Sequence, residues 1–328
     1  MTSSSVESLF NVLDETALIL QEELSITYLE AIAETAENLF QDGILQDELS
    51  DISKKRITKK YQEVNLEKFH TEEIRKAYQL SILKGMKENV QQNHQMTPDS
   101  IGLMMSYLIG KFLSEHRSFS VLDPAVGTGN LLSTIINGLS PKEISAIGID
   151  VDDLLIKLAF SGANLQKQQV QFFNQDSLEA LFVDPVNAVV CDLPVGYYPN
   201  DIRASEYELG LKSGHSYAHH LFIEQSVQHT LPGGYLFFLI PNGLFSSQYS
   251  EQLHTYLQKH VHIQGVLQLP LSMFKSEQTA KSILIMQKKA EGVKPPKQIL
   301  LVDLPKLSNH QAMENILVKI DQWFKEYK

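Results

Sequence analysis

The feature that most constrains the fold is an alternation, from Pro98 onward, of short apolar segments with segments of helical periodicity. Such alternation is typical of βαβ units, in which a helix connects two parallel strands. The predicted strands are residues 120–124, 146–151, 170–174, 188–191, 235–240, 263–269 and 282–287, with a further edge strand at 298–302. The interval between 263–269 and 282–287 leaves little room for a crossover helix, so these two segments are predicted to pair antiparallel. The chain is therefore predicted to be an α/β protein with a doubly wound, mostly parallel sheet and an antiparallel strand near its end.

The sequence before Pro98 has a different texture. Apolar residues recur there at helical spacing, for example at Leu9, Val12 and Leu13, and no proline interrupts them. We therefore predict a helical N-terminal domain over residues 1–93 and the α/β domain over 94–328. A basic run in the helical part favours a solvated helix face over a phosphate-binding surface; it comprises Lys54, Lys55, Arg56, Lys59 and Lys60.

Composition limits the compartment and the partners. No apolar run approaches the roughly 20 residues that span a bilayer, and the N-terminus lacks the pattern of a signal peptide. The single cysteine, Cys191, fits a reducing compartment, so a cytoplasmic protein without a membrane partner is predicted. The formal net charge of −11 disfavours a nucleic-acid partner without excluding it, because an acidic chain can still carry a local basic patch. The oligomeric state is not predicted.

A glycine loop, Asp123-Pro124-Ala125-Val126-Gly127-Thr128-Gly129-Asn130, lies where the first predicted strand leads into a helix. Glycines there let the backbone turn tightly and approach a ligand, and the amides at the helix start favour a negatively charged group. Asp150 follows the loop by about 20 residues, the spacing at which an acid binds ribose hydroxyls. Leu132 replaces the third glycine of the dinucleotide fingerprint, and no P-loop Gly-Lys-Ser/Thr follows. These features favour a nucleoside cofactor, and Asp123 could hold the ammonium group of a methionine moiety on it. A tight turn without a ligand is the alternative.

The third predicted strand is followed by Asn174-Gln175-Asp176-Ser177. At the carboxyl edge of the sheet, Asp176 could accept a hydrogen bond from an adenine amino group. The alternative is that Asp176 or Ser177 caps a helix that begins at Leu178. Both interpretations stay open at this point.

The fourth predicted strand delivers a carboxylate, Asp192, followed by Leu193, Pro194 and two tyrosines, Tyr197 and Tyr198. Methylation of an exocyclic amine needs acceptors that aim the nitrogen lone pair at the methyl group. Asp192 and the Leu193 carbonyl could supply them, and a tyrosine could stack on a planar base. A strand-terminating loop with packing tyrosines is the alternative.

Other chemistry-bearing residues are weaker candidates. His215, His219 and His220 form a cluster in which the first two would share a helical face, yet no third metal ligand accompanies them. They are predicted to be structural or surface residues, and no metal site is predicted. The Pro232-Gly233-Gly234 segment is predicted to connect a helix to a strand, and Asn242 could face the cleft.

The order of these motifs resembles a known family. Residues 94–287 resemble class I S-adenosylmethionine-dependent methyltransferases, above all adenine-N6 DNA methyltransferases of the modification-subunit type in Type I restriction systems and their standalone bacterial relatives. The resemblance is carried by MTPDSI (96–101), DPAVGTGNLL, GIDVDD, NQDS, DLPVGYYP, HHLFIEQSVQHTLPGGYLFFLIPNGLF and VLQLPLSMFKSEQTAKSILIMQK. It implies a Rossmann-like fold and S-adenosylmethionine as cofactor.

The resemblance also implies roles for individual residues. The expected cofactor contacts are Thr97, Asp123, Gly127, Thr128, Gly129, Asn130, Asp150, Val151, Asp176, Ser177 and Asp192, and the expected catalytic residues are Asp192, Pro194 and Tyr197. The family pattern is Asn or Asp, Pro, Pro, then Tyr or Phe, whereas here Leu193 and Val195 depart from it. Tyr197 or Tyr198 would then replace the stacking aromatic, and no long target-recognition domain is evident. We therefore expect N-methylation of an amine, with adenine in DNA as one acceptor. A non-catalytic S-adenosylmethionine-binding regulatory or scaffold protein and a nucleotide-dependent oxidoreductase are the alternatives.

Overall fold

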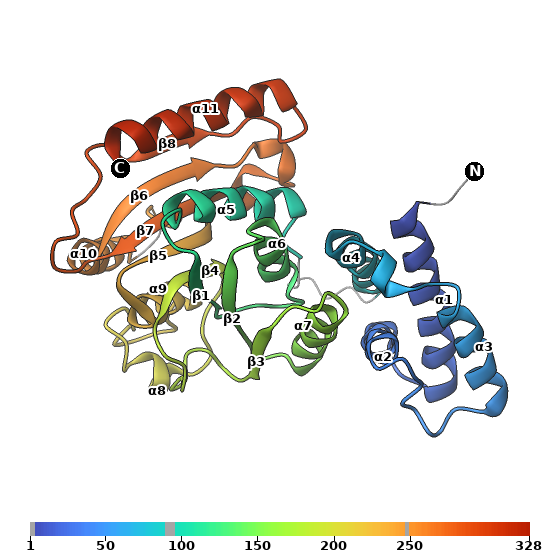
Figure 1. Cartoon of the computed structure of the whole chain (residues 1–328). Helices are drawn as coiled ribbons and strands as arrows, with labels where there is room; N and C mark the ends of the chain where they lie inside the picture. The colour runs from blue at the N-terminus through green and yellow to red at the C-terminus, as the bar shows by residue number, and fades with distance from the viewer. Residues whose placement is uncertain (1–3, 89–95, 247–248) are drawn as a thin grey trace. The chain divides into compact units, whose positions relative to one another are not determined.

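A computed structural model describes residues 4–88, 96–246 and 249–328 (Figure 1). Its strands form a sheet in the order β3-β2-β1-β4-β5-β7-β6-β8. The strands are β1 (Ser118–Asp123), β2 (Glu143–Asp150), β3 (Val170–Asn174), β4 (Val186–Asp192), β5 (Thr230–Pro241), β6 (Val261–Gln268), β7 (Lys281–Lys288) and β8 (Leu300–Asp303). The helices are α1 (Ser5–Leu24), α2 (Tyr28–Phe40), α3 (Asp51–Tyr61), α4 (Thr71–Glu88), α5 (Asp99–Phe112), α6 (Asn130–Gly138), α7 (Asp153–Leu165), α8 (Asp201–Ala204), α9 (Ala218–Gln228), α10 (Ser250–His260) and α11 (His310–Tyr327). The predicted α/β class is confirmed.

The strand pairing follows the predicted pattern. β2 pairs with β3, β1 with β4, and β4 with β5, all in parallel. β7 runs antiparallel to both β5 and β6, which confirms the antiparallel pair near the end of the domain. β8 is the predicted edge strand and pairs with β6 in parallel. β5 is buried over most of its length, as expected for a strand covered on both faces.

The structure corrects one local prediction in this sheet. Pro232-Gly233-Gly234 does not form a separate connection between a helix and a strand; it lies inside β5. The pairing of β4 with β5 shifts register between Val186 and Ala188, opposite this segment. Gly233 has φ +79°, and its carbonyl accepts a hydrogen bond from Gln287 of β7 at 2.9 Å. The segment is therefore absorbed into the strand as an irregularity of the β4–β5 pairing, and the bond from Gln287 ties it to β7.

The chain divides into two compact units, which are described one at a time. The first contains Met1–Ser106, Val126–Pro141 and Ala146–Gln175. Side-chain oxygens of Ser4, Thr27 and Ser50 cap the N-termini of α1, α2 and α3. The predicted helices before Pro98 are thus confirmed over the described residues, and the basic run lies on α3 with its side chains exposed or half-buried. The predicted domain boundary between residues 93 and 94 lies outside the described residues and stays a prediction.

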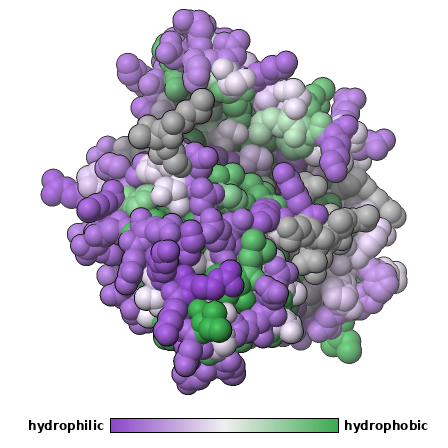
Figure 2. All heavy atoms as spheres, turned by 90° about the vertical axis from the view of Figure 1, so that its right-hand side faces the viewer, coloured by the Kyte–Doolittle hydropathy of each residue, from purple (hydrophilic) through white to green (hydrophobic). Residues whose placement is uncertain are grey.

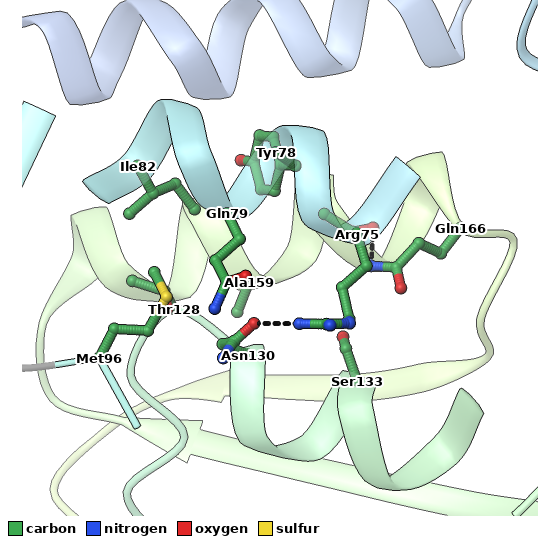
Figure 3. A pocket seen from close by; sticks show the side chains of 12 residues that line it. Arg75, Tyr78, Gln79, Ile82, Met96, Thr128, Asn130, Ser133, Ala159 and Gln166 are labelled. Atoms are coloured by element: carbon green, nitrogen blue, oxygen red, sulfur yellow. Dashed lines mark hydrogen bonds between the residues drawn. The ribbon is translucent and has the colours of Figure 1, made fainter. Parts of the chain in front are cut away.

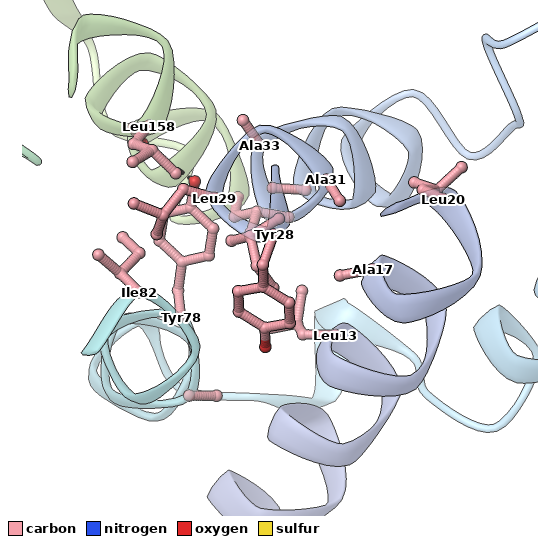
Figure 4. Packing of buried hydrophobic residues seen from close by; sticks show 14 of the residues in the cluster. Leu13, Ala17, Leu20, Tyr28, Leu29, Ala31, Ala33, Tyr78, Ile82 and Leu158 are labelled. Carbon is pink, nitrogen blue, oxygen red and sulfur yellow. Dashed lines mark hydrogen bonds between the residues drawn. The ribbon is translucent and has the colours of Figure 1, made fainter. Parts of the chain in front are cut away.

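The core of this first unit joins the N-terminal helices to α7. Apolar side chains of α1, α2 and α4 pack with Leu155, Leu158 and Leu165 of α7 in one buried cluster. Figure 4 shows Leu158 beside Leu29 of α2 and Tyr78 of α4. The Tyr78 hydroxyl donates a hydrogen bond to the Leu158 carbonyl at 3.1 Å. The helical segment therefore shares its hydrophobic core with a helix of the α/β part.

The second unit contains Tyr107–Ala125, Lys142–Ser145 and Asp176–Lys328. It holds β1 and β4 to β8, and α11 packs against β8 (Figure 1). Aromatic contacts tie α11 to the sheet, since Phe112 contacts Tyr235 of β5 together with Trp323 and Phe324 of α11. Within the described residues, no helix is long and apolar enough to cross a membrane. On the face drawn in Figure 2 hydrophilic residues predominate, in keeping with the acidic composition.

Candidate functional site

The glycine loop turns where the sequence places it. Gly127 and Gly129 have φ of +54° and +78°, a region that favours glycine. A Cβ at Gly127 would meet nothing within 4 Å, whereas a Cβ at Gly129 would lie 3.1 Å from that of Ala159. The backbone at Gly127 is thus open to a ligand, while Gly129 permits close packing of the loop on α7. Thr128, between them, is half-buried.

Asp150 closes the loop from the end of β2. Its Oδ2 accepts a hydrogen bond from the Gly127 amide at 2.8 Å, and its Oδ1 accepts one from the Asp152 amide at 3.0 Å. A carboxylate has about four acceptor positions, so it can bind a pair of ribose hydroxyls while the amides hold it in place. Val151, the next residue, is 72% exposed and offers an apolar surface beside that carboxylate. Both residues are placed where a nucleoside could be gripped.

Asn130, at the start of α6, joins a network that sequence reasoning missed. Its Oδ1 accepts a hydrogen bond from Arg75 at 2.8 Å, and its Nδ2 donates to the Thr97 carbonyl at 3.0 Å. Arg75, from α4, also forms ion pairs with Glu72 and Asp99. Figure 3 shows the Arg75 guanidinium pointing from α4 to Asn130, with the hydrogen bond drawn between them. The side chain of Asn130 is therefore engaged with the protein, and Thr97 is held by its backbone.

Electrostatics reinforce this network. Burial alone would lower the pKa of Arg75 and raise that of Asp99. The bonds between the two groups outweigh burial, so the pKa of Arg75 is raised and that of Asp99 is lowered. The side chain of Arg75 is only 3% exposed, so its charge depends on these partners. A small cavity lies next to it, lined by α4, α7 and the loop residues Thr128 and Gly129 (Figure 3). Because Arg75 and Asn130, which line this cavity, are hydrogen-bonded to each other, we interpret it as a gap in the packing between α4 and the glycine loop.

Asp123 and Ser177 are buried in the second unit. Asp123 is 1% exposed, and its Oδ1 accepts a hydrogen bond from the Ala125 amide at 3.1 Å. Ser177 is 3% exposed and donates to the Pro124 carbonyl at 2.5 Å. Ser177 thereby fixes the start of the glycine loop from the segment that follows β3.

Asp176 does not cap a helix, because a loop leads from it to β4. That alternative is therefore wrong. Its Oδ1 accepts a hydrogen bond from the Leu178 amide at 2.8 Å, and its Oδ2 accepts one from the Tyr198 hydroxyl at 2.7 Å. Burial, together with the Asp176 charge, raises the pKa of Tyr198 above its usual value. Asp176 thus holds Tyr198 inward, which removes this tyrosine as a stacking candidate.

Asp192 ends β4 beside a residue that the sequence did not reveal. The Lys281 ammonium, at the start of β7, donates to Asp192 Oδ1 at 2.5 Å. The amide of Leu193 donates to the Leu239 carbonyl at 3.2 Å, which holds the backbone after Asp192 against β5. Pro194 follows, half-buried. Lys281 lies 89 residues further along the chain, inside a segment that carries the family resemblance, but the resemblance assigned it no role.

Asn242 also lies at this edge of the sheet. Its Oδ1 accepts a hydrogen bond from Ser282 at 2.7 Å, and its amide donates to the Ala280 carbonyl at 3.0 Å. Asn242 therefore ties the end of β5 to the start of β7, next to Lys281.

Tyr197 is the exposed aromatic of the Asp192 loop, at 64% exposure. Its ring stacks on Tyr217 with a centroid distance of 5.1 Å and an interplanar angle of 15°. Tyr217 in turn stacks on His219, with the centroids 5.1 Å apart. Val195, where the family has an aromatic, is 60% exposed. The loop thus presents an aromatic ring, but two residues beyond the position typical of the family.

The histidines do not share a helical face as predicted. His215 precedes α9, is exposed and lies 3.1 Å from Asp201. His219 and His220 are buried in α9, and burial lowers the pKa of each to about 4. His219 Nδ1 and His220 Nε2 have no hydrogen-bond partner among the described residues. In the same part of the chain, no group of three His, Cys, Asp or Glu residues is arranged to hold a metal ion.

Comparison with known proteins identifies both parts of the chain. Residues 7–86 match the model of the YtxK N-terminal helical domain, and residues 74–328 match that of the N-6 DNA Methylase family. The uncharacterized protein YtxK of Bacillus subtilis is 49% identical over the full length of both chains.

Solved structures agree with these matches. A Listeria monocytogenes protein assigned to the class I S-adenosylmethionine-dependent methyltransferases has 49% identity and a TM-score of 0.91, with 98% of this chain and 99% of that chain covered. The modification subunit of a type I restriction enzyme from Vibrio vulnificus shares the fold, with a TM-score of 0.68 at 16% identity, over 88% of this chain and 65% of that one. The resemblance predicted from motif order is thereby confirmed. The chain belongs to the N-6 DNA methylase family and carries the YtxK-type helical domain at its N-terminus.

Proposed function

We propose that the chain binds S-adenosylmethionine and transfers its methyl group to the nitrogen of an amine, with adenine in DNA as the favoured acceptor. The observation that carries the proposal is the bond between the Gly127 amide and Asp150 Oδ2, at 2.8 Å. It joins the glycine loop to the acid that suits ribose hydroxyls.

The residues around this bond fit the cofactor. The space at Gly127 is open, Asp150 can accept hydroxyl hydrogens, and Val151 offers an apolar surface to a flat ring. The remaining expected contacts belong to the same proposal: Thr97, Asp123, Thr128, Gly129, Asn130, Asp176, Ser177 and Asp192. When bound, the cofactor supplies an electrophilic methyl group on a sulfonium.

Asp192 is the proposed acceptor-side group. Its carboxylate and the Leu193 carbonyl accept hydrogens of the amine, which aims the nitrogen lone pair at the methyl carbon. A nitrogen–carbon bond forms while the carbon–sulfur bond breaks and its electron pair stays on sulfur. The proton that the nitrogen then loses passes to Asp192 or to water. Pro194 stiffens the loop that carries these acceptors, and the exposed ring of Tyr197 is available for stacking on a planar acceptor.

Calorimetry tests cofactor binding. We expect saturable binding of S-adenosylmethionine that Asp150→Ala weakens about 10- to 100-fold, because hydrogen bonds to a charged group are lost. Asp153→Ala is the matched control, since Asp153 is an exposed acid at the start of α7, three residues after Asp150, and it should change the affinity little. Absence of saturable binding to the wild type would refute the proposal.

Tritiated methyl transfer into a lysate of a deletion strain tests the reaction and its acceptor. We expect label in nucleic acid that nuclease releases, and its loss in Asp192→Ala. Label released by protease instead would replace DNA with protein as the acceptor. The formal net charge of −11 makes this distinction important.

A non-catalytic S-adenosylmethionine-binding regulatory or scaffold protein is the second candidate. Val195 in place of the family's aromatic favours this candidate. The Tyr197 ring also favours it, because that ring already stacks on Tyr217. Binding of the cofactor without label in any lysate fraction would decide for this candidate.

A further inference from the structure

Lys281 and Asp192 emerge at the same edge and on the same face of the sheet, although β5 lies between their strands. Asp192 is in register with Leu239 of β5, and Pro241 of β5 is in register with Lys281 of β7. Paired residues on neighbouring strands share a face, and so do residues two apart on one strand. The lysine side chain therefore reaches across the end of β5 to the carboxylate.

The ion pair is too exposed to be explained by stability. The side chains of Lys281 and Asp192 are 27% and 20% exposed, and the ammonium lies 2.5 Å from Oδ1. Partly solvated pairs of this kind contribute little to folding. A lysine on a flexible stem could instead extend into water, so its position beside the proposed acceptor-side group calls for a functional reason.

We propose that Lys281 is a positioning residue for methyl transfer: it fixes the Asp192 carboxylate through Oδ1 and neutralises its charge. This inference rests on the proposed function. With Oδ1 held, the carboxylate cannot rotate freely, so it faces the amine in one orientation. A neutral amine then meets a pair without net charge, whereas an alkylammonium group would be placed beside the Lys281 cation and repelled. The site accordingly selects uncharged, ring-attached amines over protonated alkylamines.

The test compares Lys281→Met and Lys281→Arg with Lys288→Met. Lys288 lies at the other end of β7 and donates to the Thr230 carbonyl at 2.7 Å, so it controls for loss of a hydrogen-bonded lysine from the same strand. The acceptor probes are an unmethylated adenine-containing DNA duplex and poly-L-lysine. Affinity for S-adenosylmethionine is measured in parallel by calorimetry.

For Lys281→Met we expect kcat on DNA to fall about 10²-fold, as for a misplaced catalytic group, while cofactor affinity stays within about twofold. Lys281→Arg should recover part of the rate because it retains the charge. Transfer to poly-L-lysine relative to DNA should rise in Lys281→Met alone. The proposal is overturned if Lys281→Met matches the wild type or Lys288→Met, or if arginine restores nothing.

A second measurement is independent of transfer. Acetylation mapped by mass spectrometry should modify Lys281 slowly compared with the exposed Lys275, and Asp192→Asn should accelerate it. Equal rates would show that the pair does not form. If the wild type methylates no probe, the proposed function fails and this role fails with it; if the wild type is active and Lys281→Met is equally active, only the role of Lys281 fails.

Discussion

Two pairs of a cation with an aspartate occupy different settings in this molecule. In the first unit, the Arg75 fork contacts Glu72, Asp99 and Asn130, and its side chain is 3% exposed. In the second, the Lys281 ammonium contacts Asp192, with side-chain exposures of 27% and 20%. The planar guanidinium can satisfy several acceptors at fixed angles, whereas an ammonium is a point charge on a flexible stem. The first pair belongs to a buried network with several partners, and the second is a partly solvated pair at the edge of the sheet.

Burial and the number of partners separate structural from functional charges when both form ion pairs. A buried cation with several partners holds elements together, here α4, α5 and α6. A half-exposed cation beside one carboxylate at the end of a strand holds little, so its value lies in what approaches that carboxylate. Stability measurements should therefore distinguish the two sites.

The largest effect is expected from Arg75→Met. It leaves Asp99 and Glu72 without their cation and should lower the free energy of unfolding by about 3 kcal/mol or more. Urea unfolding followed by circular dichroism measures it. Lys281→Met, the matched change in the second unit, should alter stability by no more than about 1 kcal/mol. Equal losses of unfolding free energy in the two variants would show that the two ion pairs contribute equally to stability.

A smaller effect should come from two buried histidines of the second unit whose ring nitrogens His219 Nδ1 and His220 Nε2 have no hydrogen-bond partner in the described part of the chain. His219 and His220 have a pKa of about 4 in the folded chain, compared with an ordinary value near 6.5. Between these values the unfolded chain binds more protons, so stability falls as pH falls from 6.5 toward 4 and stops falling below that. His220→Phe should remove about 2 kcal/mol of the loss between pH 7 and pH 5.

The control for that measurement is Ser226→Ala, because Ser226 is buried in the same helix but carries no group that titrates in this pH range. The pH dependence of its unfolding free energy should match that of the wild type. An unchanged slope in His220→Phe would show that His220 is protonated in the folded state, contrary to its burial.

The smallest effect is expected from Tyr198→Phe. It removes one hydrogen bond to Asp176, which keeps its bond from the Leu178 amide, so the cost should be about 1 kcal/mol. Thermal unfolding measures it. Tyr207→Phe, which removes a bond to the neutral Leu178 carbonyl, provides the comparison. A loss of unfolding free energy as large as that of Arg75→Met would show that the Asp176 bonds contribute to stability as strongly as the Arg75 network does.

The sequence predicts what is local or periodic in this molecule. The strand segments and the turn at Gly127 and Gly129 follow from apolar runs and from glycine spacing, and the structure confirms them. Asp150 lies against the loop, as a fixed spacing from the glycines predicted. The contacts of Asn130 and Asp192 could not be predicted, because Arg75 and Lys281 are 55 and 89 residues away and no sequence pattern links either pair. The helix after Asp176 was an open alternative because a capping residue and a loop aspartate share the same local sequence.

The shared core of α1, α2, α4 and α7 has a consequence for any truncated form of the chain. Removing the N-terminal helices would uncover Leu155 and Leu158 on α7 and would leave Asn130 without Arg75. The helix that follows Asp150 and the helix that follows Gly129 would each lose a support. A ligand that orders the glycine loop would also stabilise the helices that pack on it. It would therefore slow amide hydrogen exchange in the N-terminal helices, although it does not contact them. The N-terminal helices therefore contribute to the stability of the glycine loop. Deleting them is expected to weaken the loop as a mutation within it would.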